Sequence, residues 1–372
     1  MSEVYSPTSL IFDSFARKEK ISMDIGDVNF DESQYLDLIG NMALEAAKLN
    51  MLHYTETSGT YNLRHAILKT YVMDYYDYNE ENVIVTSGGK QAVYCVMAAL
   101  LNPDDEIVIF KPYWPAYISI ANALNLKVVI VDTTLSNYQI DMDIVRENIS
   151  ENTKMVIINN PNNPTGIIQD SSIIDKLVEF CRSRNIYILS DEVYITPHKK
   201  ELYSILSCPS SINAKEYILV VNSLSKTFAI SGLRLGWLIA DTLVIKRVRA
   251  IQSIITTSPC SLSQYIGEKL LAEHMQCSIK IDEELSIKRS KAIRVLNNNL
   301  KALPDVGPYV LLKTALGGVE TSKILYDMFR IAVMPGNIFG LDDCIRISLL
   351  PKTEILEKYL YQIEKYLNNG EG

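Results

Sequence analysis

The feature that most constrains the fold is a series of short apolar segments that alternate with helical patterns from about residue 82 onward. Several segments are continuous apolar runs, which is typical of strands buried on both faces of a mostly parallel sheet. The predicted strands cover residues 83–86, 106–110, 127–131, 155–159, 186–190, 217–221 and 233–240. The pattern predicts an α/β fold with a seven-stranded sheet, whose ligands bind beyond the carboxyl ends of the strands.

The chain on either side of this sheet predicts a second, smaller domain of helices and short strands. With 372 residues, the chain is long enough for two domains. We expect residues 1–40 to form an N-terminal arm and part of the small domain, and residues 41–283 to form the large domain. Residues 284–372 then complete the small domain. Outside the sheet, we expect helices over residues 35–50 and 353–368, and a short strand over residues 21–30 that breaks at a glycine.

The composition narrows the class of function. A net charge of −8 argues against a nucleic-acid-binding surface. No apolar run approaches the length of a membrane span, and the first residues lack a signal-peptide pattern. The six cysteines lie far apart, without the paired spacing of a zinc site or a disulfide framework. We therefore expect a cytoplasmic protein with reduced thiols, no metal site, and neither nucleic acid nor membrane as a partner.

The end of the sixth predicted strand carries the most informative segment. Ser223, Ser225 and Lys226 follow that strand closely, and Arg234 comes eight residues after the lysine, on what is predicted as the next strand. Serine hydroxyls and a guanidinium group suit a phosphate. Cationic neighbours lower the pKa of a lysine, which favours the free amine that a Schiff base requires. The alternative is a strand end with a solvated lysine, so the other parts of such a site must appear in order.

Two further predicted strands are followed by segments that suit a ligand with a phosphate group and a flat ring. Gly88, Gly89 and Lys90 open a predicted helix after the first strand, where backbone amides can approach an anion. Trp114 lies between two prolines after the second strand, and an indole stacks on flat heterocycles. Each segment also has a simpler interpretation, an ordinary turn for the glycines and core packing for the tryptophan.

Two charged residues occur where a buried charge needs a partner. Asp191 ends the fifth predicted strand, where a pyridinium N–H would compensate its burial, and Tyr194 could reach another edge of the same ring. The alternative for Asp191 is a helix N-cap. Arg346 lies in an apolar strand, where a carboxylate ligand held by two hydrogen bonds would compensate its charge. The alternative for Arg346 is a surface-facing position.

The loop after the fourth predicted strand is the last of these candidate site segments. Its sequence over residues 160–166 is Asn-Pro-Asn-Asn-Pro-Thr-Gly, in which the prolines can hold Asn163 in one orientation as an amide donor. This motif, the lysine segment and the order of all the segments resemble the pyridoxal-phosphate-dependent class I/II aminotransferases, the aspartate aminotransferase superfamily of fold type I. The resemblance extends from about residue 21 to about residue 348.

The resemblance implies a role for each matched residue. Lys226 would form a Schiff base with the aldehyde of pyridoxal 5′-phosphate and move a proton at the substrate α-carbon, while Asp191 would pair with the ring nitrogen. The other implied cofactor contacts are Asn163 and Tyr194 at the ring hydroxyl, Trp114 on the ring face, and Gly88, Gly89, Lys90, Ser223, Ser225 and Arg234 at the phosphate. Arg346 and the backbone of Gly26 would bind the substrate α-carboxylate. Tyr54 would reach the phosphate of the neighbouring subunit in a homodimer with shared active sites.

The implied reaction moves an amino group between an α-amino acid and a 2-oxo acid. Another reaction at the α-carbon uses the same cofactor contacts and remains an alternative, for example a lyase or an arginine oxidase or cyclase of a natural-product pathway. A regulator that only senses the cofactor is disfavoured, because Lys226 is present and no room exists before residue 21 for a DNA-binding domain.

The sequence departs from the resembling family at three places. Asp27 and Val28 follow the matched Gly26, where family members commonly carry Glu-Pro. The segment over residues 303–346 looks short, which puts the side-chain pocket in doubt. Residues 251–259 lack the arginine that aspartate-specific members place over the partner's substrate, so we expect dicarboxylic amino donors to be disfavoured.

Overall fold

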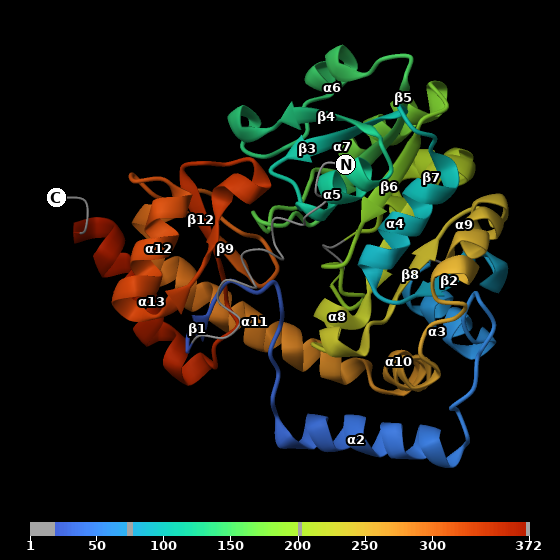
Figure 1. The fold of residues 1–372 in the computed structure, drawn as a ribbon, viewed down its shortest axis with the longest axis horizontal. Coiled ribbons are helices and arrows are strands. Elements are labelled where there is room, and N and C mark those ends of the chain that lie inside the picture. Colours follow the sequence, from blue (N-terminus) through green and yellow to red (C-terminus); the bar gives the residue numbers. More distant parts are fainter. Residues whose placement is uncertain (1–18, 73–76, 200–202, 370–372) are drawn as a thin grey trace.

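A seven-stranded sheet forms the centre of the larger part of the molecule. The computed structural model describes residues 19–72, 77–199 and 203–369 (Figure 1). The strands of the large sheet are β2 (Val83–Thr86), β3 (Glu106–Lys111), β4 (Lys127–Asp132), β5 (Thr153–Asn159), β6 (Tyr187–Asp191), β7 (Ile218–Ser223) and β8 (Gly236–Ile239). Their order is β2-β8-β7-β6-β5-β3-β4, and only β8 runs antiparallel to its neighbours. The predicted α/β class and the mostly parallel seven-stranded sheet are confirmed.

Among the seven predicted strands only the first has the predicted bounds, and the other six differ by one to three residues at one end or both. The seventh strand begins at Gly236 rather than at residue 233, because a 3-10 turn covers Ser231–Leu233 and Arg234 has a left-handed backbone with φ 51°. Arg234 therefore lies in the turn before β8 and not on the strand. The sixth strand begins at Ile218, because a 3-10 segment extends through Tyr217.

Both faces of the large sheet are covered, which explains the continuous apolar runs. On β7, Ile218 and Val220 belong to one buried cluster, whereas Leu219 and Val221 belong to the other. Successive side chains of a strand point to opposite faces, so the four consecutive residues from Ile218 to Val221 are all apolar. The helices of this part are α3 (Tyr61–Tyr71), α4 (Gly89–Leu100), α5 (Ala116–Ala123), α6 (Met142–Asn148), α7 (Ser171–Ser183), α8 (Leu224–Thr227), α9 (Thr242–Ile255) and α10 (Ser261–Glu273).

Segments from both ends of the chain form the smaller part. Strands β9 (Tyr309–Lys313), β11 (Met334–Pro335) and β12 (Cys344–Ser348) form an antiparallel sheet in the order β11-β12-β9. Strand β1 (Ile21–Ser22) pairs with β10 (Ile331–Ala332), and Met23 shares a buried cluster with residues of β9, β12 and α13. The predicted strand over residues 21–30 is thus reduced to two residues. The helices here are α11 (Met275–Leu296), α12 (Gly318–Phe329) and α13 (Thr353–Asn369).

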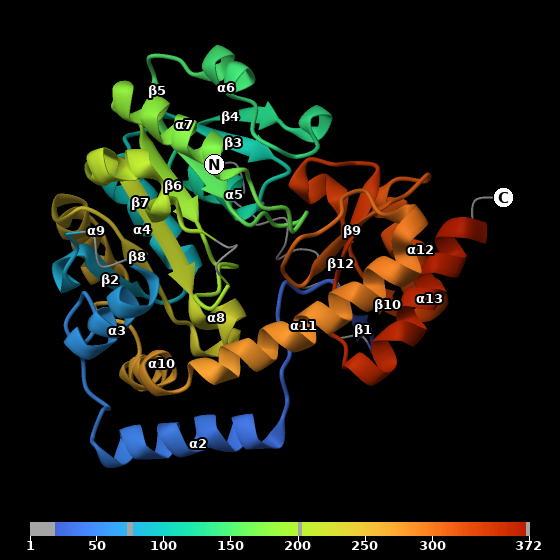
Figure 2. The same cartoon turned by 180° about the vertical axis from the view of Figure 1, so that it is seen from behind.

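Two helices connect the parts. Helix α2 (Ser33–Lys48) packs against α10, and α11 runs from beside α10 to the smaller part, where it packs against α13 (Figure 2). The predicted domain boundaries at residues 40 and 283 fall inside these two helices, and the division stays a prediction. Of the predicted N-terminal arm, residues 1–18 lie outside the described residues. None of the described helices combines the length and apolarity that crossing a membrane requires.

Candidate active site

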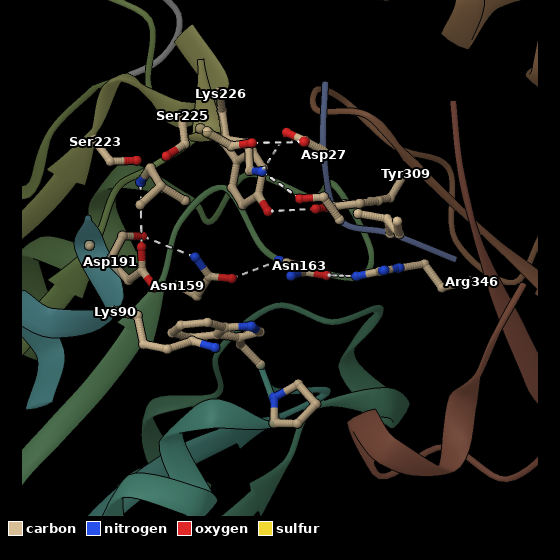
Figure 3. A pocket seen from close by; sticks show the side chains of 18 of the residues that line it. Asp27, Lys90, Asn159, Asn163, Asp191, Ser223, Ser225, Lys226, Tyr309 and Arg346 are labelled. Atoms are coloured by element: carbon tan, nitrogen blue, oxygen red, sulfur yellow. Dashed lines mark hydrogen bonds and ion pairs between the residues drawn. The ribbon is translucent and has the colours of Figure 1, made fainter. Parts of the chain in front are cut away.

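A cavity of about 310 Å³ opens where the carboxyl ends of the large sheet face the smaller part. Its lining residues come from the large sheet, from the N-terminal segment, and from β9, β12 and the turn Gly336–Phe339 (Figure 3). The predicted site residues that line it are Gly26, Gly89, Lys90, Trp114, Asn163, Asp191, Tyr194, Ser223, Ser225, Lys226, Arg234 and Arg346. Residues separated by up to 320 positions in the sequence are therefore brought to one cavity.

Lys226 lies on α8, the short helix that directly follows β7. Its Nζ donates a hydrogen bond to the carbonyl oxygen of Gly26 and lies 3.7 Å from Oδ1 of Asp27. Ser231 Oγ donates to Asp27 Oδ2 at 2.7 Å. The amine thus faces the cavity, and the N-terminal segment reaches it from far away in the sequence. Asp27 is a neighbour of Lys226 that sequence reasoning recorded only as a departure from the family pattern.

Lys90 and Arg234 form a cationic end of the cavity. Burial, and then the nearby charge of Arg234, lower the pKa of Lys90. Arg234 Nη1 donates to the carbonyl oxygen of Ser231 at 2.8 Å. A side chain at Gly88 would place its Cβ 2.5 Å from Arg234 Nη2, so Gly88 makes room for the guanidinium instead of lining the cavity. In the described part of the chain neither cation has a carboxylate partner, which suits a phosphate.

Asp191 ends β6 and is 4% exposed. Burial raises the pKa of its carboxyl group to about 6, although a hydrogen bond from Tyr117 Oη at 2.6 Å opposes this shift. No helix follows Asp191, so the N-cap alternative is wrong. A buried carboxylate without a cation is stabilised by a ligand that brings one, such as a protonated ring nitrogen. Tyr117 was missed by sequence reasoning, because nothing local to α5 shows that its side chain reaches β6.

Arg346 is buried and not surface-facing, with an exposed fraction of 4%. Its Nη1 donates to Asn163 Oδ1 at 3.0 Å and its Nη2 donates to the Asp24 carbonyl oxygen at 2.8 Å. The guanidinium carbon lies 4.2 Å from the centre of the Tyr309 ring. Arg346 Nε has no hydrogen-bond partner among the described residues. A buried guanidinium with neutral partners only is suited to a carboxylate ligand.

Asn163 and Tyr194 are oriented by hydrogen bonds. The backbone N–H of Asn163 donates to Asn159 Oδ1 at 2.7 Å, while its side-chain oxygen faces Arg346. Tyr194 Oη donates to Tyr309 Oη at 3.0 Å. Tyr309 is a second cavity residue that sequence reasoning missed, because β9 meets the large sheet only in the folded chain. A Cβ at Gly26 would lie 2.7 Å from Tyr309 Oη, so a side chain at position 26 would displace the tyrosine.

Tyr54 does not reach the cavity of its own chain, and its side chain is 87% exposed. The described residues hold no group of three or more histidine, cysteine, aspartate or glutamate side chains placed for a metal ion.

The donor set fits pyridoxal phosphate. Lys90, Arg234 and two serine hydroxyls suit its phosphate, and Asp191 suits its ring nitrogen. Trp114, whose ring centre lies 5.3 Å from Lys90 Nζ, offers a flat face for the ring. An amine at Lys226 suits its aldehyde. The residues present therefore match the phosphate, the ring nitrogen, the ring face and the aldehyde of this cofactor.

Comparisons with known proteins agree with this chemistry. The family model described as aminotransferase class I and II matches residues 18–360. An aspartate aminotransferase from Thermotoga maritima is 32% identical over 85% of this chain and 84% of its own length. One from Pyrococcus horikoshii is 31% identical over 96% of this chain and 94% of its own length.

Solved structures show the same likeness across the whole chain. The crystal structure of a Thermotoga maritima aspartate aminotransferase has a TM-score of 0.90 at 28% identity and covers 99% of both chains. That of an aromatic aminotransferase from Pyrococcus horikoshii has a TM-score of 0.85 at 26% identity and covers 98% of this chain and 99% of its own. The protein accordingly belongs to the class I and II aminotransferases and is a pyridoxal-phosphate-dependent aminotransferase acting on amino and 2-oxo acids.

Proposed function

We propose that Lys226 is the residue that bonds the cofactor and moves the proton during amino-group transfer. The observation that supports this most is the position of its Nζ, which faces a cavity shared with the cationic end, Asp191 and Arg346. When bound, pyridoxal phosphate supplies an aldehyde that condenses with amines and a ring that accepts electrons from the substrate. Lys226 Nζ would take the proton from the substrate α-carbon and deliver it to the cofactor carbon that carried the aldehyde.

The other residues of the cavity hold the cofactor and orient the substrate. Asp191 keeps a proton on the ring nitrogen through a charge-assisted hydrogen bond. Lys90, Ser223, Ser225 and Arg234 hold the phosphate. Arg346 binds the substrate α-carboxylate through guanidinium N–H groups that have no protein acceptor, Nε among them, while Asn163 Oδ1 and the Asp24 carbonyl oxygen hold Nη1 and Nη2 in place. This arrangement directs the α-carbon toward Lys226.

An isotope experiment tests the transfer itself. Incubating the enzyme with ¹⁵N-labelled amino acids and a panel of 2-oxo acids should yield labelled product amino acids. The amount of label in the product should equal the amount of 2-oxo acid formed from the donor. Release of the label as ammonia, with or without oxygen consumption, would instead indicate a lyase or an oxidase reaction on the same cofactor.

We further propose a homodimer in which Tyr54 completes the partner's phosphate site. The 87% exposure of Tyr54 in the single chain supports this, because a tyrosine gains little from standing free in water. A two-fold interface would produce two equivalent sites. Mixing inactive Lys226→Ala protein with an inactive Tyr54→Ala variant tests it, since one site of each mixed dimer would be intact. Activity near a quarter of wild type is expected, and none despite subunit exchange would confine Tyr54 to its own chain.

We also propose that the protein is located in a reducing compartment, the cytoplasm, because of the state of its cysteines. All six cysteines lie in the described residues and none of them forms a disulfide bond, and Cys260 is exposed. Thiols that are not paired in disulfides persist where glutathione keeps them reduced. Cell fractionation with an antibody against the protein tests this location, and recovery with the cytoplasmic marker is expected.

A further inference from the structure

Asp27 is a charged residue of the cavity that has been assigned neither to the cofactor nor to the substrate α-carboxylate. Among the described residues that line the cavity, Asp27 and Asp191 are the two with carboxylate side chains. It lies on the side of Tyr309 and Arg346, while Lys90 lies on the opposite side (Figure 3). The Asp27 side chain is 33% exposed and therefore accessible from the cavity.

The local sequence fixes the orientation of this carboxylate. Oδ1 accepts a hydrogen bond from the backbone N–H of Val28 at 2.8 Å, and Oδ2 accepts one from Ser231 Oγ at 2.7 Å. A proline at position 28 would have no N–H to donate. The Asp27-Val28 pair thus builds a carboxylate that is held in place before any substrate arrives.

The cation that now faces Asp27 is Lys226, whose Nζ lies 3.7 Å from Oδ1. If Lys226 bonds the cofactor, as proposed above, its amine is no longer free to serve as this ammonium partner. The two remaining partners are a neutral hydroxyl and a backbone N–H. A partly buried carboxylate then gains from a new cation, and a charge-assisted hydrogen bond is stronger than a neutral one.

We propose that Asp27 binds the cationic end of the substrate side chain, an amine or a guanidine, so that the enzyme favours basic amino acids. The inference rests on the proposed role of Lys226 and specifies the substrate class of the same site. Arg346 takes the α-carboxylate and Asp27 takes the side-chain cation, both on the same side of the cavity. An acidic side chain placed there would meet like charge, so aspartate and glutamate are disfavoured.

A pair of substrates with equal length tests the assignment. L-Ornithine ends in an ammonium group where L-norleucine ends in a methyl group. For wild type, kcat/KM for ornithine should exceed that for norleucine by about tenfold or more, the value of one hydrogen bond to a charged group. In Asp27→Asn this ratio should fall about tenfold, and in Asp27→Glu it should stay above that of the Asn variant.

A matched control is Asp104→Asn, which removes a carboxylate 3.7 Å from Lys127 Nζ on the surface and should leave the ratio unchanged. Binding without turnover is measured by calorimetry with α-methylornithine and α-methylnorleucine, which lack the α-hydrogen. The preference for the cationic analogue should be lost in Asp27→Asn.

The inference and the proposed function fail separately. Transfer of ¹⁵N from norleucine with an unchanged ornithine-to-norleucine ratio in Asp27→Asn would overturn the inference and leave the function intact. A wild-type enzyme that uses aspartate better than ornithine would also overturn it. If no amino acid donates nitrogen while the α-methyl analogues still bind with the expected preference, the function fails and the inference stands.

Discussion

The two halves of the cavity are built in different ways. The proposed cofactor half consists of Lys90, Asp191, Lys226 and Arg234, which end a strand of the large sheet or lie in the connections between its strands. The substrate half consists of Asp27, Tyr309 and Arg346, which come from three segments that meet only in the folded chain. Local strand-to-helix connections place the first half, and long-range packing between the two parts places the second. Mutations in one half should therefore affect cofactor binding, and mutations in the other half should affect substrate binding.

The largest effect is expected from Lys226→Ala in the cofactor half. Removing the amine that bonds the cofactor and moves the proton should reduce turnover about 10⁵-fold or more. The fold should be unchanged by circular dichroism, because the Lys226 side chain contributes little to the core. Borohydride reduction of wild type followed by peptide mapping should find the cofactor on Lys226. Attachment to another lysine would contradict the assignment.

Asp191→Ala should lower kcat about 10³-fold, since an electrostatic partner of the reacting system is lost. The matched control is Glu192→Gln, which alters an equally buried neighbour that accepts from the Ile205 backbone N–H at 2.8 Å and does not line the cavity. This control should keep most of the activity. Similar losses in both variants would mean that the sheet edge tolerates no change there, whatever the function of Asp191.

The pKa of Asp191 predicts a stability difference in the cofactor-free protein. Burial raises this pKa from 3.8 to about 6, so the folded state prefers the neutral carboxyl and loses stability as pH rises through this range. Asp191→Asn cannot ionise and should be more stable than wild type by up to about 3 kcal/mol at pH 7.5. Urea unfolding at pH 7.5 and 4 measures the difference, which should shrink at pH 4. A less stable variant at pH 7.5 would show that another group compensates the charge.

Tyr117→Phe should give the smallest effect, because it removes a single hydrogen bond to Asp191 and leaves the ring in place. We expect kcat to fall about tenfold, with KM for the amino acid little changed. This is the pattern expected if Tyr117 acts by positioning Asp191. Adding Tyr117→Phe to Asp191→Ala should cause no further loss, since the two residues act through one contact. Additive losses would assign Tyr117 a separate function.

The same contrast explains how much could be predicted from sequence. Asp191, Asn163 and Lys226 were found because the carboxyl ends of parallel strands share one edge of the sheet. Arg234 was placed on a strand, because its left-handed backbone has no marker in the sequence. Tyr117 and Tyr309 were missed, since their partners are 74 and 115 residues away. Arg346 was proposed from its apolar strand and then from the family resemblance, with a surface-facing position as the alternative, and the structure shows that it is buried.

The most direct test compares Arg234→Ala with Arg346→Ala by measuring two dissociation constants for each variant. The account predicts that Arg234→Ala raises the Kd of pyridoxal phosphate at least about tenfold and changes amino-acid binding little once the cofactor is saturating. Arg346→Ala should raise the Kd of the α-methyl amino acid about a hundredfold, for the loss of a two-pronged charged contact, and leave the cofactor Kd within about twofold. If Arg346→Ala instead releases the cofactor, or if both variants weaken both ligands equally, the division of the cavity into two halves is wrong.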